Sequence, residues 1–211
     1  MYLRLRGERY KKFVTSEGAW FLIDDSNGQT RVQYMSRDQK RGGAQHFTKP
    51  SQLKGFMVWA AFSCREKATL RFIGSGCKVN CDFYIKEVLI PFIKEDLPRL
   101  YPDNDYIFHQ DSAPAHKANK TLAYLRSKNI NFIKSEKWMP NNPDAAPSDF
   151  FVWGYLKSKL ARCKISTLHE LKNAILTEFR KVPQTLLDRA LKAWLKRCCQ
   201  IFYAKGGSIE I

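Results

Sequence analysis

Two aspartates lie in local sequences that suit them for chemistry. Asp111 follows the short apolar run Tyr106-Ile107-Phe108 and precedes small residues and a proline. A run this short, rich in aromatic and β-branched side chains, favours a buried strand over a helix. Asp111 would then lie near the carboxyl end of that strand, where ligands usually bind in open α/β sheets. Because Asp is also a good helix N-cap, this stretch alone favours a binding residue and a cap equally.

The second aspartate, Asp149, follows a proline-rich stretch. Prolines at 140, 143 and 147 exclude a helix before Pro147 and predict an extended path. Pro147 suits the first turn of a new helix, and Asp149 falls in that turn, where the helix dipole favours a carboxylate. A strand-end Asp and a helix-start Asp can meet in space. Since Mg²⁺ binds through few carboxylates and keeps positions for substrate phosphates, the pair predicts a divalent-cation site.

Together, residues 106–116 and 138–151 resemble the catalytic core of mariner-type transposases, whose motifs run approximately HDNAPSH and SPDLAPSD. The resemblance extends from about Phe13 to the C-terminal helices. It implies a ribonuclease-H-like fold and assigns the second and third catalytic acids to Asp111 and Asp149. The third acid is Asp rather than Glu, and the preceding Asp144 is expected to be structural.

The first acid is where the match fails. The family pattern V-T-x-D-E-x-W, aligned on Val14, Thr15 and Trp20, puts Glu17 where Asp is expected and Gly18 where Glu is expected. Glu keeps the oxygen ligand but is one methylene longer. Mg²⁺ demands near-ideal octahedral geometry, and a two-metal site holds its ions about 3.5–4 Å apart. Whether Glu17 sustains catalysis is therefore an open question at this point.

Asp25 and then Asp24 are the substitutes for Glu17 as first acid. Both are less favoured, because they lie in a turn that ends at Asn27-Gly28. Asp is common in turns for local hydrogen-bonding reasons, and the strand would have to slip to bring either aspartate to the site.

Two histidines and a group of basic residues complete the candidate site. His109 shares a strand face with Asp111 if the strand is regular, and His116 matches the family's histidine after the second acid. Both are predicted to support the ligands, although a surface role for His116 is equally favoured. Some of the following residues should contact DNA phosphates, and about half should be a solvated face: Lys117, Lys120, Lys134, Lys137, Lys157, Lys159, Arg162 and Lys164.

Composition limits the class of protein. The 211 residues suit one domain, and 36 Lys and Arg against 20 Asp and Glu give a net charge of +16, which favours a polyanionic partner. No apolar run of spanning length, basic amphipathic helix or signal-peptide core is present, so no membrane role is expected. The 6 cysteines lack zinc-site spacing and are predicted to be reduced thiols of a nuclear or cytosolic protein.

Hydrophobic patterns predict an α/β protein with strands first, then strand–helix alternation, then helices. This order favours a mixed sheet of about five strands with helices on both faces. Residues 1–12 would be a basic remnant, 13–205 the catalytic domain and 206–211 a tail. The expected strands are 13–23 (irregular at Gly18), 31–35, 55–62, 70–73, a strand to Asp111, and 130–133. A loop is expected at 36–54, and helices at 82–97 (kinked at Pro91), 115–127, 147–162, 167–181 and 184–203.

The resemblance implies that Glu17, Asp111 and Asp149 hold two Mg²⁺ or Mn²⁺ ions, hydrolyse a phosphodiester and direct strand transfer into DNA. It also implies a nuclear location, a homodimer as one arrangement, and no small-molecule cofactor. Family members carry two helix-turn-helix modules ahead of the core, and only a short segment precedes Phe13. The expectation is therefore a fragment, a decayed copy or a recruited domain. The alternatives to an enzyme are an inactive nucleic-acid-binding module and a purely structural domain.

Overall fold

The long strand β1 (Phe13–Ile23) is the centre of a four-stranded mixed sheet. It pairs antiparallel with β2 (Lys54–Phe62) on one side and parallel with β4 (Ile107–His109) on the other. β3 (Arg71–Gly74) pairs antiparallel with β2, so that the order is β3-β2-β1-β4. The computed structural model describes residues 7–23, 54–134, 145–205, 207 and 209.

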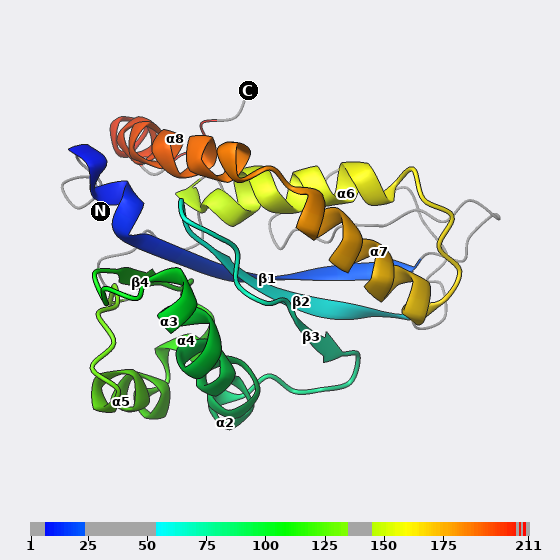
Figure 1. Cartoon of the computed structure of the whole chain (residues 1–211), viewed down its shortest axis with the longest axis horizontal. Coiled ribbons are helices and arrows are strands. Elements are labelled where there is room, and N and C mark those ends of the chain that lie inside the picture. The colour runs from blue at the N-terminus through cyan, green and yellow to red at the C-terminus, as the bar shows by residue number, and fades with distance from the viewer. Residues whose placement is uncertain (1–6, 24–53, 135–144, 206, 208, 210–211) are drawn as a thin grey trace.

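Helices cover both faces of this sheet (Figure 1). A short 3₁₀ helix, η1 (Gly7–Lys12), leads into β1 and lies beside α8. One layer consists of η7 (Ser148–Trp153), α6 (Gly154–Leu160), α7 (Leu168–Lys181) and α8 (Gln184–Tyr203). The opposite layer consists of α2 (Cys81–Phe83), η3 (Tyr84–Leu89), η4 (Phe92–Asp96), α3 (Leu97–Leu100), α4 (Pro114–Lys117) and α5 (Asn119–Ser127).

Successive side chains of β1 point to opposite faces of the sheet and pack into two separate parts of the core. Phe13 and Phe21 lie on the face towards α8 and η7, where they meet Trp194 and Trp153 edge-to-face at centroid distances of 5.3 and 5.9 Å. Val14 points the other way, into the cluster beneath η3 and η4. This period of two is the ordinary consequence of strand geometry. Glu17 shares its face with Phe13 and Phe21, and therefore faces the layer that contains η7.

The helix predicted at 82–97 extends over residues 81–100 and contains two π-helical segments, η3 and η4, on either side of Pro91. Proline has no backbone N–H to donate, which disturbs the α-helical hydrogen-bond ladder. Tyr84, the first residue of η3, is buried in the core and only 1% exposed.

Asp96 anchors this helix to the sheet. Its carboxylate is 1% exposed. Oδ1 accepts hydrogen bonds from the backbone and hydroxyl of Thr69 at 2.9 and 2.8 Å and from Arg99 at 3.2 Å. Oδ2 accepts from Arg71 on β3 at 2.7 Å. Both oxygens of the buried charge therefore accept hydrogen bonds, as burial of a charge requires.

Three predicted elements differ from the structure. β1 is regular through Gly18, which pairs in register with Trp59. The helix expected at 115–127 is divided at Ala118, whose ψ of 136° is extended. Residues 130–133 make one parallel bridge, between Phe108 and Phe132, instead of a strand. The described residues therefore form four strands and two isolated bridges, the other being between Phe62 and Lys67, where about five strands were predicted.

The turn with Asp24 and Asp25, the return strand at 31–35 and most of the 36–54 loop lie outside the described residues, as do Lys137 and Asp144. In the parts of the chain that are described, no helix combines the length and the apolar character needed to cross a membrane.

Candidate active site

The pairing of β1 with β4 brings the first two acids to one region of the sheet. The parallel register aligns Thr15 with His109, and two residues further along each segment come Glu17 and Asp111. Side chains two apart share a face. Asp149 lies in the first turn of η7, an element in contact with β1. Three distant segments therefore lie near one rim of the sheet, where Glu17 interacts electrostatically with both Asp149 and Asp111.

Glu17 is 9% exposed. Burial raises its pKa well above 4.5, and the negative charges of Asp149 and Asp111 raise it further. Glu17 also donates a hydrogen bond to Asp149, which favours the protonated form of Glu17. The pKa of Asp149 is raised as well, chiefly by burial and by the charge of Asp111, which outweigh that hydrogen bond. Both carboxyl groups therefore have a pKa above that of an isolated carboxylate, because they are buried and lie near other acids.

Asp111 differs from its two neighbours. Burial acts to raise its pKa, but the hydrogen bond and charge of His116, together with the backbone N–H of Ala113, hold the pKa below its usual 3.8. Ala113 donates to Oδ1 at 3.0 Å, and His116 donates to the same oxygen from Nδ1. Within the described part of the chain both hydrogen bonds end on Oδ1. Oδ2 of an ionised Asp111 is therefore the oxygen available to a cation.

The donor set fits a hard divalent cation. Carboxylate oxygens are the ligands that Mg²⁺ and Mn²⁺ prefer. Burial and the neighbouring acids raise the pKa of Glu17 and Asp149, and Lys157 opposes this only in part at Asp149; a cation would offset the remaining negative charge. The described residues contain no group of three or more His, Cys, Asp or Glu already arranged to hold a metal ion. Metal binding would therefore require the carboxylates to rearrange, with Glu17 leaving its hydrogen bond to Asp149.

Both predicted histidines are buried. The Nδ1 atom of His109 lies 2.9 Å from the hydroxyl of Thr15, and its ring meets Trp194 at a centroid distance of 5.0 Å. Burial lowers its pKa to about 3. His116 is 7% exposed and stacks on Tyr84 with centroids 4.1 Å apart. The surface alternative for His116 is thus wrong, and its contact with Asp111 agrees with a supporting role.

The predicted basic residues are spread over several elements. Lys157 and Lys159 are half-buried on α6, while Lys117, Lys120, Lys134, Arg162 and Lys164 are exposed. Lys120 forms an ion pair with Asp82, and Lys159 lies over the ring of Tyr155 at 5.2 Å. Burial lowers the pKa of Lys157 to about 8, although the charge of Asp149 opposes this. Lys157 is therefore the basic residue with an electrostatic link to the acids.

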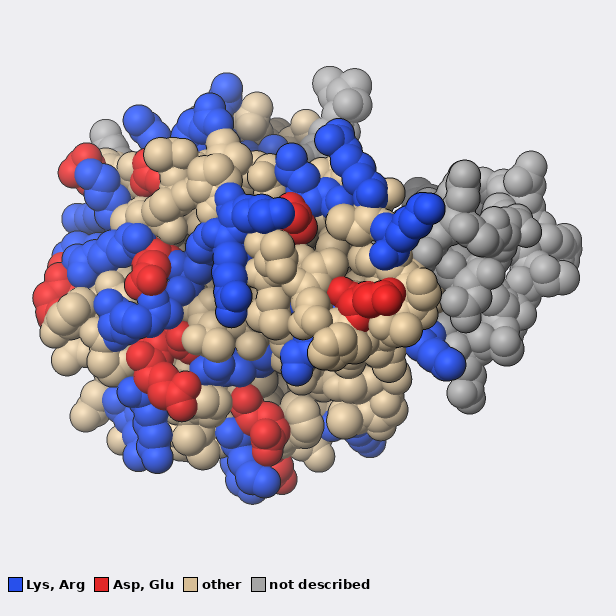
Figure 2. All heavy atoms as spheres, turned by 45° about the vertical axis from the view of Figure 1, so that its right-hand side comes forward, with Lys and Arg blue, Asp and Glu red and all other residues tan. Residues whose placement is uncertain are grey.

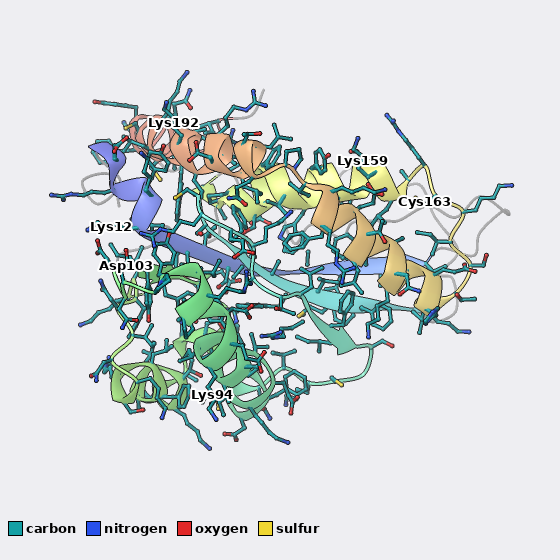
Figure 3. The ribbon with its side chains drawn as sticks, in the orientation of Figure 1. Lys12, Lys94, Asp103, Lys159, Cys163 and Lys192 are labelled. Carbon is teal, nitrogen blue, oxygen red and sulfur yellow. The ribbon has the colours of Figure 1, made fainter. Side chains whose placement is uncertain are left out.

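Positive charge is not confined to one element. Figure 3 shows Lys159 and Lys192 on the layer of α6 and α8, and Lys94 on the opposite layer. Figure 2 shows Lys and Arg spread widely over one face with Asp and Glu between them. Two open hollows, one beside β3 that includes Phe72 and one that includes Arg9, contain none of the three acids. The acids thus stand apart from both hollows.

Comparison with known proteins gives two curated relatives. The chain is 28% identical to the Tc3 transposase of Caenorhabditis elegans over 206 residues, 97% of this chain and 59% of that protein. It is 22% identical to the Tcb1 transposase of Caenorhabditis briggsae, over 82% of this chain and 57% of that protein. No family model matches the chain. The chain thus spans less than two thirds of each relative.

Solved structures of Mos1 transposase share the fold. The Mos1 catalytic domain matches with a TM-score of 0.70 and 16% identity, over 99% of this chain and 90% of that one. The predicted resemblance to mariner-type transposase catalytic domains is confirmed. A Mos1 paired-end complex matches with a TM-score of 0.77 and 19% identity, over 99% of this chain and 60% of that one. The mariner-type, ribonuclease-H-like fold predicted from the sequence is thereby confirmed.

Proposed function

We propose that this chain is the catalytic part of a transposase that cleaves DNA and joins it to a new site, with Glu17, Asp111 and Asp149 as ligands for two Mg²⁺ or Mn²⁺ ions. The observation that supports this most is the electrostatic coupling of the three carboxylates on one rim of the sheet. The relatives are named transposases, and Mos1 structures with Mn and with Mg share the fold.

The chemistry follows from the state of each acid. A bound cation pair would lower the pKa of a water molecule and neutralise charge on the phosphodiester. Asp111 is ionised and presents Oδ2. Because burial and the neighbouring acids favour the protonated form of Glu17, cation binding to its carboxylate would be coupled to proton release. The protein acts by positioning and charge, with no covalent intermediate on a side chain.

DNA is the partner that the charge favours. A net charge of +16 attracts phosphate backbones without regard to sequence. Lys157, on α6, which directly follows η7 with its Asp149, is the best candidate for a phosphate contact next to the acids. The remaining predicted contacts are the other basic residues that follow Asp111 and Asp149 in the sequence. We also propose a nuclear location, where chromosomal DNA is, and a homodimer that would present two sites to two DNA ends.

An inactive nucleic-acid-binding module is the second candidate. Glu17 stands where the family pattern has Asp, and it is hydrogen-bonded to Asp149. Because Glu17 is one methylene longer than Asp, it favours a site that cannot coordinate the metal ions correctly. The fold and the basic surface would remain. This candidate predicts salt-dependent DNA binding without cleavage.

Nicking of supercoiled plasmid DNA in the presence of Mn²⁺ separates the two candidates. The parent chain, Glu17→Asp and Asp111→Asn should be compared at equal protein concentration. Nicking by the parent that Asp111→Asn abolishes supports the enzyme. An inert parent whose Glu17→Asp variant cuts DNA supports the inactive module. If the parent neither cuts nor binds DNA at low salt, both candidates fail and a structural domain is left.

A further inference from the structure

A buried polar network lies directly behind Asp111. Gln110, 6% exposed, extends its side chain to the opposite side from Asp111. Its amide oxygen accepts a hydrogen bond from the hydroxyl of Tyr84 on η3 at 3.0 Å. Its amide nitrogen donates to the backbone carbonyl of His116 at 3.1 Å. One side chain thereby ties both ends of the 110–116 segment to the π-helical part of the neighbouring helix.

Tyr84 supports the same segment in a second way. Its ring stacks on the imidazole of His116, with centroids 4.1 Å apart and ring planes inclined by 35°. His116 in turn donates from Nδ1 to Oδ1 of Asp111. Tyr84 therefore holds both the backbone of His116, through Gln110, and its ring. An ionised carboxylate can only accept hydrogen bonds. The hydrogen bond to Asp111 therefore requires the imidazole of His116 to carry a proton on Nδ1.

We propose that Gln110 and Tyr84 are positioning residues for Asp111: they fix His116 so that Oδ1 of Asp111 is occupied and Oδ2 is presented to the metal. Hydrogen bonds to a ligating carboxylate set its orientation, and loss of such outer partners typically weakens metal affinity about 10–100-fold. Thr121 adds to the rigidity of the segment, because its hydroxyl donates to the carbonyl of Ala115 at 2.7 Å. This inference rests on the proposed function, since it takes Asp111 to be a metal ligand.

Two substitutions test the network at different points. Gln110→Met keeps an unbranched side chain of similar length and removes both hydrogen bonds. Tyr84→Phe removes only the hydroxyl and keeps the ring against His116. Tyr101→Phe is the matched control, because Tyr101 is equally buried and its hydroxyl donates to the carbonyl of Lys11 at 2.6 Å, away from the acids. Each tyrosine variant thus deletes one buried hydroxyl.

Mn²⁺ affinity, measured by calorimetry without DNA, is the first measurement. Gln110→Met should weaken Mn²⁺ binding about 10-fold, at the lower end of the range for outer partners. Tyr84→Phe should weaken it by less, and Tyr101→Phe should leave it unchanged. In the double variant, Tyr84→Phe should add little to Gln110→Met, because the hydroxyl acts through the amide. Equal affinities in the parent, Gln110→Met and Tyr84→Phe would overturn the positioning role and leave the proposed function intact.

The second measurement does not depend on metal. Long-range ¹H–¹⁵N spectra of the histidine rings report which nitrogen of His116 carries the proton. The parent should show Nδ1 protonated, and Gln110→Met should shift His116 towards the other tautomer while His169 stays unchanged. An unaltered His116 signal in Gln110→Met would overturn the network itself. A parent that binds no Mn²⁺ would overturn the proposed function and with it any role of these residues towards a metal.

Discussion

The hydroxyl of Thr15 on β1 lies 2.9 Å from Nδ1 of His109 on β4, and the same two residues are aligned in the parallel register of these strands. This contact links the two halves of the site. Glu17 lies two residues after Thr15, and Asp111 lies two residues after His109. A slip of one residue in the pairing of β1 with β4 would therefore turn one of the two acids to the opposite face of the sheet. The hydroxyl of Ser16, which donates to the carbonyl of His109 at 3.0 Å, adds a second link at the same level.

His109 should make the stability of the chain depend on pH. Burial lowers its pKa to about 3, whereas the unfolded chain has the ordinary value of 6.5. The unfolded state therefore takes up a proton as the pH falls below 6.5 and the folded state does not. The neutral histidine contributes stability that is present above pH 6.5 and is lost as the pH falls towards 3. Between pH 7.5 and 5 the parent should lose about 2 kcal/mol of unfolding free energy through this residue.

Urea denaturation at the two pH values measures this loss. His109→Gln keeps a polar side chain opposite Thr15 and cannot titrate, so its loss should be smaller than that of the parent by about 2 kcal/mol. His169→Gln, on the exposed surface of α7, is the control and should behave as the parent. Equal losses in the parent and in His109→Gln would show that the histidine is not the source.

Glu17→Gln should stabilise the chain in the absence of metal. The folded-state pKa of Glu17 is raised above 4.5, so its ionised form destabilises the folded state at neutral pH, and this penalty disappears as the pH falls and the group is protonated. An amide removes the charge. The variant should therefore have a higher melting temperature than the parent at pH 7.5, with the difference shrinking at acid pH.

The same variant should lose the response to metal. At a Mn²⁺ concentration of 100 times its dissociation constant, a bound ion would stabilise the parent by about 2.7 kcal/mol. The Glu17→Gln variant should be stabilised clearly less by the same concentration of Mn²⁺. Glu87→Gln, on an exposed turn of η3, should match the parent in both respects. A parent that is more stable than Glu17→Gln without metal would contradict the electrostatic account of this carboxylate.

The sequence predicted elements well where the signal is local. The strand at 13–23 and the helix at 184–203 have the predicted bounds, because their apolar residues recur with the period of one structure. The break at Ala118 has no local signal such as proline or glycine. It accompanies a tertiary arrangement in which His116 turns inward to Asp111 and Thr121 donates to the carbonyl of Ala115.

The sequence singled out the three acids and the two histidines beside Asp111, but not Tyr84 and Gln110. Motif spacing identified Asp111 and Asp149, and the alignment of β1 identified Glu17. Tyr84 and Gln110 come from segments whose contact depends on the sheet and on the π-helical turn. One sequence signal could have indicated Gln110. It is a polar residue at the end of a short apolar strand, and alternation along the strand points its side chain to the face opposite that of His109 and Asp111.

Asp96→Asn should destabilise the chain strongly. The substitution leaves the largely buried guanidinium of Arg71 on β3 without its charged partner at 2.7 Å, and only the more distant carboxylate of Glu95, at 3.8 Å, remains. Breaking a buried ion pair by removing one partner costs about 3–5 kcal/mol. Asp103→Asn is a matched control, because Asp103 forms a two-point contact with Arg65 at the surface, where ion pairs contribute little. Chemical denaturation of both variants should show a large loss for Asp96→Asn only, and equal losses would contradict the anchoring role of Asp96.

The central claim is that the carboxylates of Glu17, Asp111 and Asp149 share a divalent cation. The most direct measurement is a crystal structure of the chain grown with Mn²⁺, with anomalous differences recorded to locate the metal. The account predicts a peak bounded by all three carboxylates, with Oδ2 of Asp111 as a ligand at about 2.0–2.2 Å. A map with no peak among these three side chains, or with Glu17 still hydrogen-bonded to Asp149 while Mn²⁺ binds elsewhere, would contradict it.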